Sequence, residues 1–192
     1  MKKTLVSLLA CAVMALMSSP AFATTVLKVD VPNMTQTSEW VVQARVGSVT
    51  PADLRSEGRG FFTDVELLIS NVYKGVNVPS RYVMRLVGGE GKDGMRLWIP
   101  GMPTFKKGEE VVLFMERTSL GHIPCGLGQG VWRIHKGPSG DSWVRQSVGG
   151  MHLMERGPTG HLQGAHLPMV TPMKSLGDLA YEIYAAQPPA KP

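Results

Sequence analysis

The chain has 192 residues, a formal net charge of +5 and a hydrophobic content of 43%. This length suits one domain with a full core, and the scattered basic residues, not interleaved with aromatic ones, argue against a nucleic-acid-binding surface. The 22 glycines and 14 prolines fall between short apolar runs, which favours many short strands joined by turns.

The first 23 residues have the pattern of a cleavable export signal. Two lysines precede an apolar run over residues 5–17, and the sequence Ala-Phe-Ala ends immediately before Thr24. The run is shorter than the ~20 residues that a bilayer span needs. We therefore expect a mature protein that begins at Thr24, lies in the periplasm or the medium and has no membrane span. An uncleaved anchor and a lipidated Cys11 are the alternatives.

Alternation of apolar and polar residues predicts a series of strands. They follow a short extended segment at 26–31 and a polar stretch at 32–39 that could hold one helical turn. Val42, Ala44 and Val46, for example, share one face of the first long strand. The predicted strands cover residues 40–49, 61–73, 81–87, 95–99, 110–116, 130–135 and 142–146.

The C-terminal part changes character. Residues 149–173 are rich in Gly, Pro, His and Met and have no clear period, whereas residues 175–186 carry one apolar stripe at helical spacing. Ser175 is the expected N-cap of this helix, with Asp178 in the capping-box position.

These elements predict an all-β fold with a C-terminal helix. A small antiparallel barrel of the oligonucleotide/oligosaccharide-binding (OB) type is the first choice, and an immunoglobulin-like sandwich is the alternative. We divide the chain into a signal peptide (1–23), a β-barrel domain (24–148), a Gly/Pro/His/Met-rich segment (149–173) and a C-terminal helix and tail (174–192).

The sequence offers little support for an enzyme. It contains no G-x-S-x-G nucleophile elbow, and its carboxylates form no pattern typical of a glycosidase. Cys125 is the one cysteine left after removal of the signal, so no internal disulfide is expected. Its thiol is either buried and inert or available for an intermolecular bond, and no flanking signature indicates a Cys–His nucleophile.

Residues 89–94 match the pattern G-x-G-x-x-G. A dinucleotide site would need a helix after these glycines, and here a strand pattern follows and stops at Pro100. We therefore interpret the motif as a hairpin loop and expect no nucleotide cofactor.

Loops on a rigid barrel are the expected contact surfaces, here residues 51–60, 88–94 and 100–107. Within and beside them, the candidate binding residues are the apolar anchors Trp98, Met102 and Phe105. Gln129 is a further candidate, because it lies in a glycine-rich stretch that is either a ligand-binding loop or a structural bulge entering a strand.

The His- and Met-rich tail is the candidate metal site. Its proposed ligands are His152, Met154, His161 and His166. Imidazole and thioether ligands together suit copper in an exported protein. The alternative is structural, because methionine commonly fills gaps in cores.

Three segments resemble the barrel core of netrin-like domains and of tissue inhibitors of metalloproteinases. They cover residues 40–46, 65–75 with its Lys-Gly turn, and 108–115 with its Gly-Glu turn. The sequence also resembles uncharacterised exported bacterial proteins that share residues 100–105 and 126–130. The resemblance implies a barrel that binds another protein.

One departure limits what the resemblance implies. The metalloproteinase inhibitors begin with a cysteine that binds the catalytic zinc of the protease, and here the expected N-terminus is Thr24, with no cysteine nearby. Their disulfides are also absent. The fold can carry over, but that inhibitory mechanism cannot.

Together these observations predict an exported, non-enzymatic domain that binds an envelope or secreted protein, a protease being one candidate. The alternative function is periplasmic copper handling through the tail.

Overall fold

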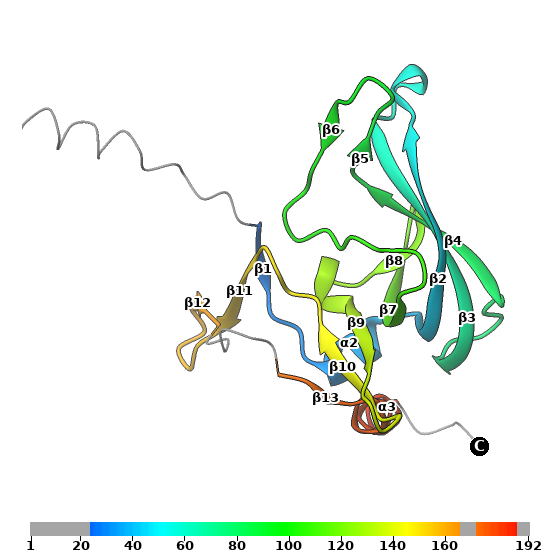
Figure 1. Cartoon of the computed structure of the whole chain (residues 1–192). Coiled ribbons are helices and arrows are strands. Elements are labelled where there is room, and N and C mark those ends of the chain that lie inside the picture. Colours follow the sequence, from blue (N-terminus) through cyan, green and yellow to red (C-terminus); the bar gives the residue numbers. More distant parts are fainter. Residues whose placement is uncertain (1–23, 166–171, 188–192) are drawn as a thin grey trace, which may run out of the picture.

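The structure is a computed structural model and describes residues 24–165 and 172–187. The predicted signal peptide lies outside these residues, as does His166. The described chain is mostly β-structure with a C-terminal helix, which confirms the predicted fold class (Figure 1).

The elements follow one another in this order: β1 (Thr24–Leu27), α2 (Val31–Thr37), β2 (Trp40–Asp53), η1 (Arg55–Glu57), β3 (Phe61–Lys74), β4 (Arg81–Val87), β5 (Gly89–Glu90), β6 (Arg96–Leu97), β7 (Glu110–Thr118), β8 (Gly121–Pro124), η2 (Leu127–Gly130), β9 (Val131–Lys136), β10 (Ser142–Gln146), β11 (Met151–Arg156), β12 (Leu162–Gly164), β13 (Lys174–Ser175) and α3 (Leu176–Ala185).

The main sheet has the strand order β13-β10-β9-β7-β2-β3-β4, with β8 paired to β7 beside this path. All of these pairs are antiparallel. The two long strands β2 and β3 carry the sheet around, so that β4 returns beside β8 (Figure 1). Strands β7, β2, β3, β4 and β8 thus form a nearly closed barrel.

Alternation along the strands places apolar side chains on both faces of the sheet. Inside the barrel, Val42, Ala44 and Val46 of β2 belong to one core cluster, as the period-two pattern predicts. On the other face, Val41 belongs to a second cluster, which α2 and α3 cover with Met34, Leu179 and Ile183 among others. The barrel therefore has its own interior and a second core beneath the helices.

Local sequence signals explain the helix ends. Ser175 caps α3 as predicted, because its Oγ accepts a hydrogen bond from the backbone N–H of Asp178 at 2.9 Å. At the C-terminus of α2, Lys74 Nζ donates to the backbone carbonyls of Thr35 at 2.6 Å and Ser38 at 2.7 Å. A lysine at this end of a helix satisfies carbonyls that lack intrahelical partners.

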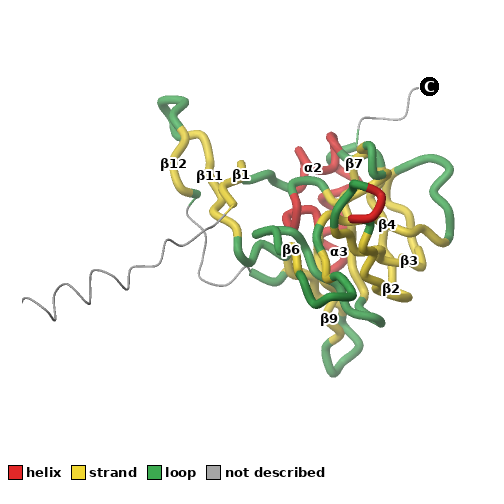
Figure 2. Tube along the Cα trace, turned by 90° about the horizontal axis from the view of Figure 1, so that it is seen from above, coloured by secondary structure: helices red, strands yellow, loops and turns green. Residues whose placement is uncertain are grey.

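The segment after residue 148 differs from the sequence-based expectation. It contains β11 and β12, and β11 pairs in parallel with β1 to form a separate three-stranded sheet. Figure 2 shows this small sheet projecting beside the barrel. Much of this sheet is exposed, and its strands therefore show little alternation of apolar and polar residues. For this reason periodicity did not predict them.

Tyr82 closes the barrel between β4 and β8. Its hydroxyl accepts a hydrogen bond from the backbone N–H of His122 at 2.7 Å and donates to the His122 carbonyl at 3.3 Å. We expect Tyr82→Phe to lower the free energy of unfolding by about 1–2 kcal/mol, because it leaves these part-buried backbone groups without their partner. Urea denaturation measures the change, and an unchanged transition would show that the two strands are held by other contacts.

Candidate functional site

The barrel interior opens into a cavity of about 320 Å³ at one end. Strands β2, β3 and β4 form one side of it, and residues 88–105, which we name the arm, form the other. Most of the lining side chains are apolar, and they include Val49, Val65, Leu86, Leu97, Trp98, Ile99, Met102 and Phe105. Polar groups, including Thr63, Glu90, Arg96 and Thr104, complete the lining.

Two glycines allow the arm to lie directly on the hairpin between β2 and β3. A Cβ at Gly91 would lie 2.6 Å from a ring carbon of Phe61, and one at Gly89 would lie 2.6 Å from the carbonyl oxygen of Phe62. A side chain at Gly89 would displace backbone, and one at Gly91 would displace the side chains of Phe61, Asp53 and Asp93. The first two glycines of the G-x-G-x-x-G pattern thus serve close packing in a hairpin, where β5 pairs with β6.

Arg55 ties the arm to the tip of the hairpin between β2 and β3. Its guanidinium lies 2.7 Å from a carboxylate oxygen of Asp53 and 2.9 Å from one of Asp93 on the arm. It also stacks over the Phe61 ring, 4.4 Å from the centroid. Hydrogen bonding to Arg55 lowers the pKa of Asp53 from its ordinary 3.8 to about 2 and lowers that of Asp93.

This ion-pair network should depend on pH in the acid range. Because the folded pKa of Asp53 is depressed, its contribution to stability is present above pH 3.8 and is lost as the pH falls through about 2. In a carboxyl NMR titration, we expect Arg55→Gln to return the Asp53 midpoint towards 3.8. Arg59→Gln, at a neighbouring exposed arginine, is the control and should leave it unchanged. A depressed midpoint in Arg55→Gln would contradict the assigned contact.

The other end of the arm is fixed by Phe105 and Arg133. Phe105 is 8% exposed and packs in the barrel core. The Arg133 guanidinium lies 5.8 Å from its ring centroid and donates hydrogen bonds to the Thr104 carbonyl at 2.7 Å and to Glu109 at 3.1 Å. The arm is therefore anchored at both ends, and its middle is more exposed.

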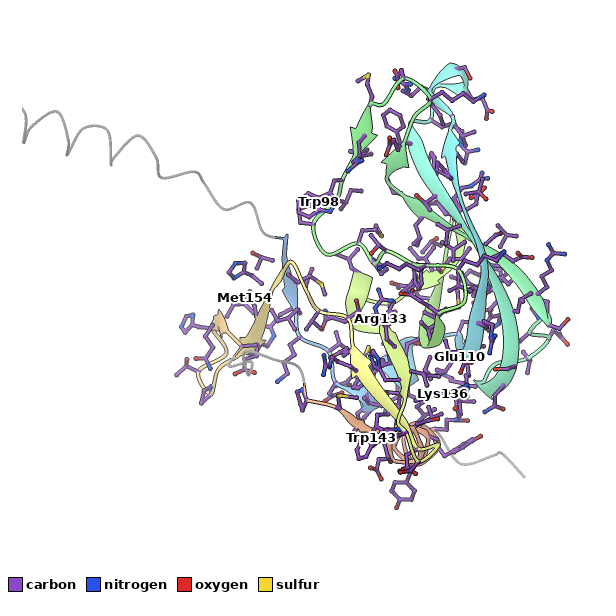
Figure 3. All side chains as sticks on the ribbon, in the orientation of Figure 1. Trp98, Glu110, Arg133, Lys136, Trp143 and Met154 are labelled. Carbon is purple, nitrogen blue, oxygen red and sulfur yellow. The ribbon has the colours of Figure 1, made fainter. Side chains whose placement is uncertain are left out.

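The structure brings Trp98, Met102 and Phe105 to the same cavity. Trp98 is 64% exposed, and Figure 3 shows it on the arm, well away from Met154 and Trp143. Met102 is partly buried against the barrel core. Phe105 forms part of the cavity wall and is buried, whereas most of the Trp98 side chain is exposed.

Gln129 lies apart from this cavity and is 1% exposed. Its Oε1 accepts a hydrogen bond from the Val29 N–H at 2.9 Å, and its Nε2 donates to the Leu27 carbonyl at 2.9 Å. The contacts are with the last residue of β1 and with the segment that follows it. This geometry agrees with the structural alternative for Gln129 and gives it no exposed atom to offer a ligand.

The three proposed copper ligands that the structure describes are spread over the small sheet and its hairpin. His152 and His161 are exposed, and Met154 is partly buried on β11. Within residues 24–165 and 172–187, no group of three or more His, Cys, Asp or Glu side chains could hold a metal ion. This observation covers neither methionine side chains nor His166, so copper binding stays a prediction.

Cys125 is buried, and its Sγ lies 3.2 Å from the Ser38 hydroxyl. Burial raises the pKa of the thiol above its ordinary value. A thiol in this state is a poor nucleophile at neutral pH, since the thiolate is the reactive form.

The charged residues that fix the arm, Arg55, Asp93 and Arg133, were not identified from the sequence. Each of them contacts a partner that only the tertiary structure brings near. The spacing of residues along the sequence therefore could not identify them.

Comparisons of the chain with protein-family models, curated proteins and solved structures returned no match. Among the residues that the structure describes, no helix has the length and apolar character needed to cross a bilayer.

Proposed function

We propose that this protein is an exported, non-enzymatic binding protein that recognises another envelope or secreted protein at the mouth of its barrel. The observation that carries the proposal is the apolar cavity between the arm and the barrel, with Trp98 exposed beside it. Export is inferred from the pattern of the first 23 residues. A protease remains one candidate partner, on the resemblance to netrin-like domains.

The cavity has the size and lining of a recognition pocket. Its volume of about 320 Å³ lies at the lower end of the ~300–1,000 Å³ range of known ligand sites. Full burial of one large apolar side chain contributes about 1.5–3 kcal/mol. Exposed tryptophans also recur among the residues that dominate protein–protein affinity. One inserted side chain with Trp98 packed against it could therefore anchor a complex.

A crosslinking capture experiment tests this proposal. The tagged full chain, expressed with its own leader, is crosslinked in the producing cell, and captured proteins are compared among variants. Trp98→Ala removes an exposed ring at the cavity, and Tyr181→Ala removes an exposed ring on α3 (76% exposed) as the control. We expect one protein to be captured by the wild type and the control but lost with Trp98→Ala. Equal capture by both variants would contradict recognition at the barrel mouth.

A further inference from the structure

The acidic and basic side chains of the arm, and of the two residues after it, differ in whether they form ion pairs. Both carboxylates of the arm are engaged internally, since Glu90 lies 3.0 Å from Arg96 and Asp93 lies 2.9 Å from Arg55. Three exposed lysines, Lys92, Lys106 and Lys107, stand on the arm or directly after it.

Within the described part of the chain, the ammonium groups of these lysines form no ion pair. Lys92 acts on Asp53 only at longer range, where it contributes a small part of the lowered pKa. Lys106 and Lys107 directly follow Phe105 of the cavity lining, and Lys92 lies two residues after Glu90 of that lining. Unneutralised positive charge therefore stands close to the apolar cavity, and a partner at the cavity would meet both.

From this combination we propose that the partner inserts one large apolar side chain that is flanked by aspartate or glutamate residues. This inference rests on the proposed function and names the chemistry of the segment that it recognises. The apolar side chain would fill the cavity, and the flanking carboxylates would meet the lysines. Charge complementarity of this kind accelerates association and selects among partners.

The concave shape of the site favours a protein side chain over a membrane surface. A bilayer presents no projecting group that could fill a cavity bounded by β2, β3, β4 and the arm. A side chain on an extended or looped segment can enter it, because the arm holds the cavity open between two anchored ends. Binding to anionic vesicles is nevertheless measured as a separate arm of the test.

Selection from a library of random displayed peptides tests the inference. The full chain and its Trp98→Ala variant serve as targets, and only peptides that depend on Trp98 are kept. We expect these peptides to share a large apolar residue with Asp or Glu nearby. For such a peptide, Lys106→Glu/Lys107→Glu should weaken the affinity by about tenfold or more, and added salt should weaken it too. Lys28→Glu/Arg156→Glu is the control, because it makes an equal change of charge at two exposed residues, one directly after β1 and one at the end of β11.

Three results would overturn the inference. Trp98-dependent peptides that lack carboxylates would refute the charge preference and leave the proposed function standing. Equal weakening by the control double variant would refute a role for Lys106 and Lys107. Binding to phosphatidylglycerol vesicles that is lost with Trp98→Ala, without selected peptides, would refute both the inference and a protein partner.

Discussion

Phe105→Ala is expected to lower the free energy of unfolding by about 3 kcal/mol. The side chain is 8% exposed and lies among the buried residues of the barrel interior. Large-to-small changes at such sites remove buried apolar surface and enlarge a cavity, and for phenylalanine they cost about 3–5 kcal/mol. The expected value is at the low end because Phe105 already borders a cavity that water can enter. Urea denaturation followed by circular dichroism measures the change.

Trp98→Ala is the matched comparison for this prediction. Because Trp98 is 64% exposed, its loss is expected to change the free energy of unfolding by no more than about 0.5 kcal/mol. The same change should weaken partner binding by about thirtyfold, which corresponds to about 2 kcal/mol. A similar loss of stability in the two variants would contradict the distinction between a wall residue and a contact residue.

Gln129→Leu is expected to lower the free energy of unfolding by about 2–4 kcal/mol. Leucine has a similar volume but cannot replace the hydrogen bonds to the Val29 N–H and the Leu27 carbonyl. Each buried backbone group that loses its partner costs about 1–3 kcal/mol. The segment after β1 should then become sensitive to limited proteolysis, because Gln129 connects it to η2.

The control for this prediction is Gln163→Leu, at an exposed position of β12. It makes the same chemical change without breaking a buried hydrogen bond, so its transition should match that of the wild type. If Gln129→Leu were as stable as Gln163→Leu, the N-terminal segment would have to be held by its pairing with β11 alone.

The sequence predicted those strands and helix ends whose formation depends mainly on residues close together in the chain. Alternation identified β2 and β3, and a continuous apolar run identified β7, which is buried on both faces. Ser175 was identified as the cap of α3 from its own sequence context. The parallel pairing of β1 with β11 joins segments more than a hundred residues apart. Neither segment carries a strong periodic pattern, so that sheet could not be derived from the sequence.

The residues of the candidate site also fall into two groups, those that the sequence predicted and those that only the fold brings together. Trp98, Met102 and Phe105 were predicted as a group because they lie close together in one Pro- and Gly-containing segment. The opposite wall comes from Val49, Val65 and Leu86 on three different strands, which only the barrel brings together. Phe105 is buried because Arg133 and the barrel hold the end of the arm in place. The amino-acid composition of the segment does not predict this burial.

A photoreactive residue at position 98 provides the most direct test of recognition at the barrel mouth. Benzoylphenylalanine is introduced in place of Trp98 or, as the control, in place of Tyr181, and the full chain is irradiated in the producing cell. We expect one discrete adduct with another envelope or secreted protein from position 98 and none from position 181. An adduct from position 181 alone, or the same adduct from both positions, would contradict recognition at the barrel mouth.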